Sequence, residues 1–77
     1  STTLTITLNI TRGEPGFEIT STVVYPNKKR FTGTSSSNDR VIPLKYPFPS
    51  VGTYDIEIRV RDSTGKIGKR TVPVYVR

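Results

Sequence analysis

The sequence predicts an all-β domain, and two features of its 77 residues support this prediction. Apolar and polar residues alternate along most of the chain, which is the pattern of strands that bury one face. Glycine, proline, asparagine and aspartate interrupt the alternation about every 8–12 residues, the spacing of turns between short strands. No stretch shows the 3.6-residue period of a helix. We therefore expect about seven short, mostly antiparallel strands, arranged as a sandwich or a small barrel.

The first two strands are predicted from regular alternation. Residues 3–10 place aliphatic side chains on one face, and the glycines and proline of residues 12–16 end this strand in a turn. The second strand covers residues 17–25 and carries Phe17 and Ile19 on its buried face. Both strands are expected to bury one face and to expose the other.

The middle of the chain gives weaker signals. Phe31 is expected to anchor a strand over residues 28–34, and the polar stretch 33–39 (GTSSSND) is expected to form an exposed loop. Residues 40–48 are predicted to be extended again. Pro43 and Pro47 cannot donate to a ladder, so this strand is expected at a sheet edge or only partly paired.

The last two strands form a predicted hairpin. Residues 54–61 alternate most regularly and are expected in the interior of their sheet, whereas residues 62–65 (DSTG) have the composition of a short turn. The final strand covers residues 66–76, and Pro73 places it at an edge. The predicted core collects the inward apolar side chains: Leu4, Ile6, Leu8, Phe17, Ile19, Val23, Phe31, Leu44, Phe48, Tyr54, Ile56, Ile58, Val60, Val74 and Val76.

The second half of the chain resembles PKD-type immunoglobulin-like domains. The resemblance lies in the segment from Tyr46 to Tyr54 (YPFPSVGTY), the alternating strand after it, and the Asp-x-x-Gly pattern of residues 62–65. In that family an aromatic or histidine, a spacer and a tyrosine precede a Pro-Gly-Thr-Tyr corner. Tyr46 and Phe48 resemble the first two of these positions, and Val51 stands where the family has proline.

The first half carries less of this resemblance. Residues 13–15 (GEP) resemble the family's turn before its second strand, but residues 29–34 (KRFTGT) replace its tryptophan-containing signature. The resemblance covers roughly residues 13–77 and implies an immunoglobulin-like β-sandwich. We expect residues 1–77 to form a single module, excised from a longer protein. The resemblance also implies an extracellular or cell-surface setting.

Gly52 and Tyr54 are expected to form the structural corner between two strands. Gly52 tolerates unusual backbone dihedrals in a tight turn. The ring of Tyr54 can be buried while its hydroxyl bonds a nearby backbone group, as in a tyrosine corner.

The composition excludes several kinds of chemistry. Cysteine and histidine are both absent, which removes thiolate nucleophiles, zinc fingers and the usual general base of a serine triad. Asp55 and Glu57 lie two residues apart, but on an exposed strand face that offers no cleft to raise one pKa. We expect no enzyme activity, no cofactor and no structural metal.

The net charge of +6 predicts a basic surface. Arg59 and Arg61 face outward on the alternating strand, and Lys69 and Tyr75 have the matching parity on the next strand. Lys28 and Arg30 would join them if the third strand belongs to the same sheet. Such a face could bind an anionic glycan or polysaccharide, or it could be a solvated face that keeps the domain soluble. Nucleic acid and membrane insertion are not expected.

Three functions remain open from the sequence. The first is a non-catalytic spacer or adhesion module of a larger secreted or surface protein, in contact with neighbouring domains or other surface proteins. The second is a carbohydrate- or polyanion-binding module that uses the basic face. The third is an assembly domain of a viral or prokaryotic surface layer. The sequon at Asn9 is consistent with an extracellular setting.

Overall fold

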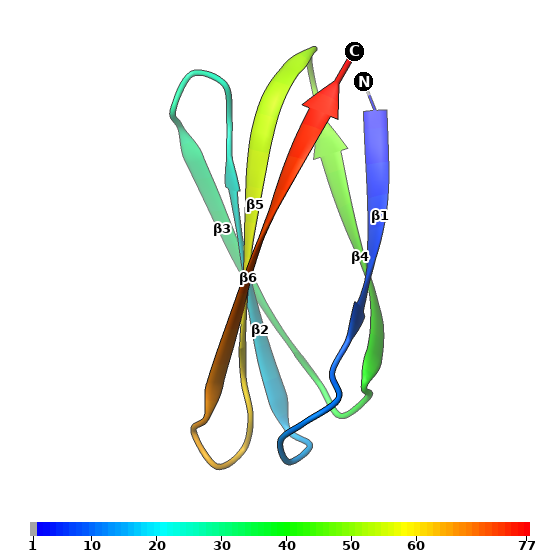
Figure 1. Ribbon diagram of the computed structural model, residues 1–77, viewed down its shortest axis with the longest axis vertical. Helices are drawn as coiled ribbons and strands as arrows, with labels where there is room; N and C mark the ends of the chain where they lie inside the picture. Colours follow the sequence, from blue (N-terminus) through cyan, green and yellow to red (C-terminus); the bar gives the residue numbers. More distant parts are fainter. Residues whose placement is uncertain (1) are drawn as a thin grey trace.

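The computed structural model describes residues 2–77, which form six antiparallel strands in two sheets (Figure 1). The all-β prediction is confirmed, with six strands in this part of the chain rather than about seven. The strands are β1 (Thr2–Asn9), β2 (Phe17–Val24), β3 (Arg30–Ser37), β4 (Val41–Phe48), β5 (Gly52–Arg61) and β6 (Ile67–Val76).

The two sheets differ in width. One sheet has the order β3-β2-β5-β6, and the other contains β1 and β4. Figure 1 shows the two sheets facing each other, with β1 and β4 on one side of the molecule. The central position of β5 and the edge positions of β4 and β6 are as the sequence predicts.

The core lies between the sheets, where the alternating side chains of both meet. Its most buried side chains are Phe17, Ile19, Tyr46, Phe48, Tyr54, Ile56 and Ile58. The inward side chains of β1 pack against this cluster but are only half-buried. Complete burial of one large apolar side chain stabilises a fold by about 1.5–3 kcal/mol, so β2, β4 and β5, which carry these seven side chains, contribute most of the stabilisation.

The prediction that Phe31 belongs to the core is wrong. Its side chain is 71% exposed, although it lies opposite the half-buried Val23 and next to the ring of Tyr25. The reason is the difference in width, because the two-stranded sheet does not cover the inner face of β3. The alternation of apolar and polar residues along a strand does not show whether another sheet covers its apolar face.

The prediction of a loop over residues 33–39 is also largely wrong, because β3 continues to Ser37. Residues 33–37 pair with β2 over the register Ser21↔Gly33 to Phe17↔Ser37. Hydroxyl pairs join the two strands, with 3.1 Å between the Oγ1 atoms of Thr22 and Thr32. An exposed edge strand needs a backbone partner but no buried face, so the polar composition of residues 33–37 is compatible with the edge position of β3. Residues 2–77 contain no helix long and apolar enough to cross a membrane.

Candidate functional site

One pole of the molecule is held by the corner between β4 and β5. The hydroxyl of Tyr54 donates a hydrogen bond to the carbonyl of Ser50 at 2.8 Å, and its ring is 1% exposed. The ring packs against Phe48, with 4.7 Å between the centroids. Gly52 has a φ of 143° and lies so close to Pro26 that a Cβ would be 2.7 Å from its Cγ. The corner residues thus have the geometry expected from the sequence.

The opposite pole is held by the buried carboxylate of Asp62. One oxygen, Oδ1, accepts hydrogen bonds from the Thr64 hydroxyl at 2.8 Å, from the Lys66 N–H at 2.9 Å and from the Thr64 N–H at 3.0 Å. The other, Oδ2, accepts one from the N–H of Glu14 at 3.1 Å. Asp62 therefore joins the β5–β6 turn to the β1–β2 loop, which connects the two sheets.

These hydrogen bonds favour the charged form of Asp62. The Thr64 hydroxyl has the largest effect, and together with the backbone N–H groups it lowers the pKa of Asp62 to about 2, although burial opposes the shift. Arg40 strengthens the same pole, because its guanidinium donates to the carbonyl of Gly13 at 2.8 Å and lies over the ring of Phe17. The Asp62 pole is thus fixed by side chains that link separate loops, whereas the Tyr54 hydroxyl fixes the other pole from within the β4–β5 corner.

The outer face of the four-stranded sheet carries part of the predicted basic site. Arg59 lies directly opposite Lys69 on β6 and opposite Thr20 on β2, and Thr20 lies opposite Thr34 on β3. Residues directly opposite in an antiparallel pair share one face, and like charges in such a pair destabilise it. Arg59 and Lys69 therefore form a cationic pair within a row of threonine hydroxyls.

The other predicted members of the site are dispersed. Arg61 lies opposite Glu18, and Arg30 makes an ion pair of 3.5 Å with Glu57. Lys28 lies in the β2–β3 turn with a φ of 71°, outside the strand.

Tyr75 is exposed on the same strand as Lys69 but is six residues further along. At the rise of a strand this separation is about 20 Å, so the ring and the cationic pair cannot contact one small ligand together. The predicted stacking partner is thus remote from the charges that would hold an anion.

The two carboxylates considered for catalysis have different neighbours and do not form a pair. Glu57 is engaged with Arg30, and Asp55 lies opposite Pro73 on the exposed face. Among residues 2–77, no cluster of three or more acidic side chains could hold a metal ion. The absence of a catalytic or metal function stays a prediction.

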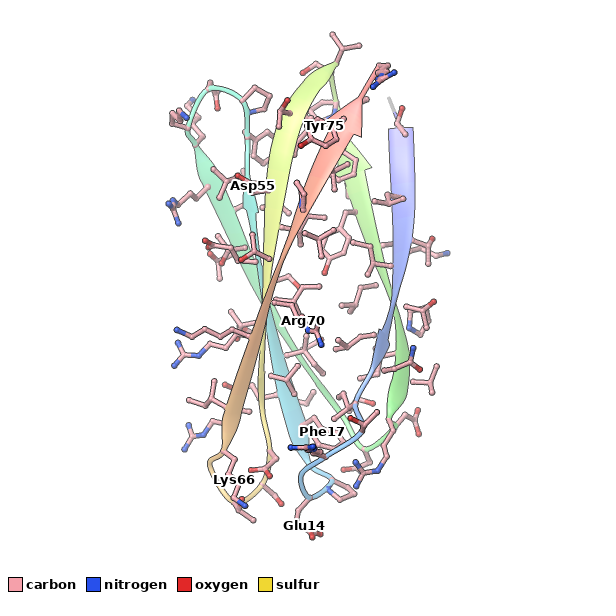
Figure 2. All side chains as sticks on the ribbon, viewed as in Figure 1. Glu14, Phe17, Asp55, Lys66, Arg70 and Tyr75 are labelled. Atoms are coloured by element: carbon pink, nitrogen blue, oxygen red, sulfur yellow. The ribbon has the colours of Figure 1, made fainter. Side chains whose placement is uncertain are left out.

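A groove of about 350 Å³ opens between β1 and β6. Its apolar lining comes from Leu8 and Ile10 on one side, and from Phe17, Ile58 and Val60 at its base. Arg70 lines it from β6, and Figure 2 shows this side chain pointing toward the space between β6 and β1. β1 is an edge strand of the two-stranded sheet, β6 is an edge strand of the four-stranded sheet, and residues of both line the groove.

Arg70 and Asp62 were not identified as candidate site residues from the sequence. Arg70 lies opposite the buried Ile58 and therefore shares the inward parity of Val72 and Val74, which is readable from the sequence. For Asp62, the pattern Asp-x-Thr-Gly favours a turn in which the side chain bonds the backbone two residues on. The link from Asp62 to Glu14 depends on tertiary structure and leaves no local signal.

Comparisons of the chain with protein-family models, curated proteins and solved structures give no match.

Proposed function

We propose that the domain is a divergent immunoglobulin-like module, and the strand order supports this proposal. Immunoglobulin domains pair strands B and E in one sheet and carry C, F and G, with C′ in the variable type, in the other. The order β3-β2-β5-β6 corresponds to C′-C-F-G, and the pair β1-β4 corresponds to B-E. On this assignment Tyr54 stands at the start of strand F and bonds upstream backbone, where immunoglobulin domains have their tyrosine corner. The PKD-type resemblance agrees with the same corner.

As its function we propose non-catalytic contact within a secreted or cell-surface protein, as an adhesion or spacing unit. The observation that supports this proposal is the fixation of both poles, by Tyr54 at one end and by Asp62 at the other. An elongated body of 38 × 20 × 16 Å with fixed ends holds a broad sheet face in a constant shape. Preorganised surfaces lose less conformational entropy when a partner binds.

An adhesion assay tests this function. Beads coated with the domain are added to cultured cells whose surface glycans are intact or have been removed enzymatically. Protein contact predicts that the beads still adhere after glycan removal, and that uncoated beads do not. Equal adhesion of coated and uncoated beads would contradict a contact function on these cells.

The pair Arg59 and Lys69 supports a second candidate function, the binding of an anionic glycan. These two cations face each other without a carboxylate opposite either of them, in a row with Thr20 and Thr34. A sulfate or carboxylate group of a polysaccharide would relieve their repulsion, and the hydroxyls could bond its oxygens. This binding would be strongly salt-dependent.

Retention on heparin, neutral polysaccharide and DNA resins tests the second candidate. Glycan binding predicts that heparin retains the domain at physiological salt and that replacing Arg59 and Lys69 by serine abolishes retention. A control variant with Lys28 and Lys45 replaced by serine loses the same charge elsewhere and should stay bound. Equal loss in both variants would show that only net charge matters.

A further inference from the structure

We propose that β3 pairs with β3 of a second copy of the domain, so that two four-stranded sheets join into one. The two strands would run antiparallel about a two-fold axis at Thr32, with Phe31 of each copy opposite Gly33 of the other. This pairing uses the backbone edge and the inner face of β3, so it does not depend on the contact and glycan functions proposed above.

The free edge of β3 is set by the middle of the chain. β3 is an edge strand of the four-stranded sheet, with β2 as its one neighbour (Figure 1). Residues 38–40 lead directly from β3 to β4 in the other sheet. On the assignment of β3 to strand C′, the strand C″ that follows it in variable-type domains has no residues between β3 and β4. Residues 2–77 therefore leave this edge uncovered.

The direction of the free backbone groups follows from the β2–β3 turn. The N–H of Tyr25 donates to the carbonyl of Lys29 at 2.8 Å, and these two residues continue the register of the strand pair. Hydrogen-bonded and non-hydrogen-bonded pairs alternate along an antiparallel ladder. The odd-numbered residues of β3 therefore bond β2. The even-numbered residues direct their N–H and C=O groups to the free edge: Arg30, Thr32, Thr34 and Ser36.

This row of groups is a template for another strand, because β3 lacks the features that block pairing. β3 contains no proline, and its one charged residue, Arg30, makes an ion pair with Glu57 of its own sheet. The other edge strand of that sheet, β6, contains Pro73 and the adjacent cations Lys69 and Arg70. Proline and charged side chains are common means of preventing edge pairing. Within this sheet, pairing between copies is therefore expected at β3.

Phe31 and Gly33 determine the register. Both lie on the inner face of β3, where the Phe31 ring is largely exposed and Gly33 has open space at the position of a Cβ. An aromatic side chain next to a glycine of the neighbouring strand stabilises a sheet edge. If Thr32 lies opposite its own copy, Phe31 lies opposite Gly33 of the other copy in a non-hydrogen-bonded pair, where side chains are closest. Each ring would then fill the space beside the other copy's glycine.

Charges at the two ends of β3 are complementary between antiparallel copies. Lys28 and Lys29 lie in the turn before β3, and Asp39 lies in the loop after it. None of these three side chains makes an ion pair within residues 2–77. An antiparallel copy brings its Asp39 toward the two lysines, and the symmetry repeats the contact at the other end. This local attraction opposes the general repulsion between two domains of net charge +6.

A single cysteine on β3 tests the pairing, because the chain has no cysteine of its own. Thr32→Cys places a thiol beside its copy on the two-fold axis, within the Cα separation that a disulfide requires. Ser36→Cys is the matched control, because it is exposed on the same face of the same strand. In the proposed register it would lie roughly 25 Å from its copy. Under oxidation, Thr32→Cys should form a disulfide-linked dimer roughly tenfold faster than the control.

Sedimentation equilibrium of the unaltered domain and of three variants measures the affinity. The average mass of the unaltered domain should rise from one copy toward two as concentration increases. Thr32→Pro removes donors at the axis but none to β2, and should abolish the dimer. Asp39→Lys should weaken the dimer about tenfold, whereas Asp55→Lys, the same charge change on the outer face of β5, should not. Circular dichroism shows whether each variant is folded.

Three results would overturn the inference. One is a single-copy mass of the unaltered domain up to millimolar concentration, which would leave the edge to a strand of a different polypeptide. Another is cross-linking of Thr32→Cys and Ser36→Cys at equal rates. The third is an equal effect of Asp39→Lys and Asp55→Lys, which would show that net charge alone governs association.

Discussion

The tyrosine corner gives a quantitative prediction, because the change Tyr54→Phe removes one hydroxyl and little else. The buried ring and its packing against Phe48 and Tyr25 remain. The lost hydroxyl donates to the Ser50 carbonyl at 2.8 Å and lies 3.1 Å from the Ser50 Oγ. One such hydrogen bond stabilises a fold by about 1 kcal/mol net. For a domain of this size we expect Tm to fall by about 4–8 °C.

Thermal unfolding followed by circular dichroism measures this change. Tyr75→Phe is the matched control, because that ring is 66% exposed and its hydroxyl bonds no side chain or backbone group of residues 2–77. The control should leave Tm unchanged within about 1–2 °C. If Tyr54→Phe lowers Tm no more than the control does, the corner hydrogen bond does not stabilise the domain and the reasoning is refuted.

Three further predictions concern the poles and the core. The pKa of Asp62 is lower when folded than the ordinary 3.8, so its carboxylate stabilises the fold above about pH 5 and loses this effect as pH falls toward 2. Asp62→Asn should therefore lower Tm at pH 7 and flatten the acid limb of a Tm–pH profile, and an unchanged acid limb would contradict the role. Gly52→Ala should cost about 1–3 kcal/mol in a denaturant titration because of its positive φ and its contact with Pro26, whereas Gly33→Ala, which has open space, should cost nothing. Ile56→Ala should cost about 2–5 kcal/mol because Ile56 is fully buried, and a loss below 1 kcal/mol would argue against the packing described.

Much of the fold follows from local pattern. The alternation from Tyr54 to Val60 identifies β5 as a strand with one covered face, and the absence of proline leaves both of its edges able to pair, as its interior position requires. Pro73 likewise identifies β6 as an edge strand, since proline cannot donate to a ladder. These signals are carried by single residues and their neighbours, so the sequence is sufficient to read them.

The errors have a common physical cause, which is the unequal width of the two sheets. Phe31 has the residue type of a core position, but β3 extends beyond the two strands that would cover it. The serines up to Ser37 have the composition of a loop, yet they pair with β2 as an exposed edge. Local sequence reports whether a residue can be buried and does not report whether another layer lies above it.

The candidate sites show the same division. Outward parity correctly places Arg59 and Lys69 on one face, because side-chain alternation is a local property. It does not reveal that Tyr75 is too far along the strand to act with them. The groove at Arg70 is lined by strands distant in the sequence, and only the three-dimensional arrangement shows it.

Amide hydrogen exchange along β3 in dilute solution tests the free edge most directly. If one edge is paired with β2 and the other is free, the amides of Phe31, Gly33 and Ser35 should be protected, while those of Thr32 and Thr34 should exchange rapidly. This alternation is a signature of a strand that is hydrogen-bonded on one side only. Equal protection of both sets would mean that the edge is already covered, and equal lack of protection would mean that β3 is not paired with β2.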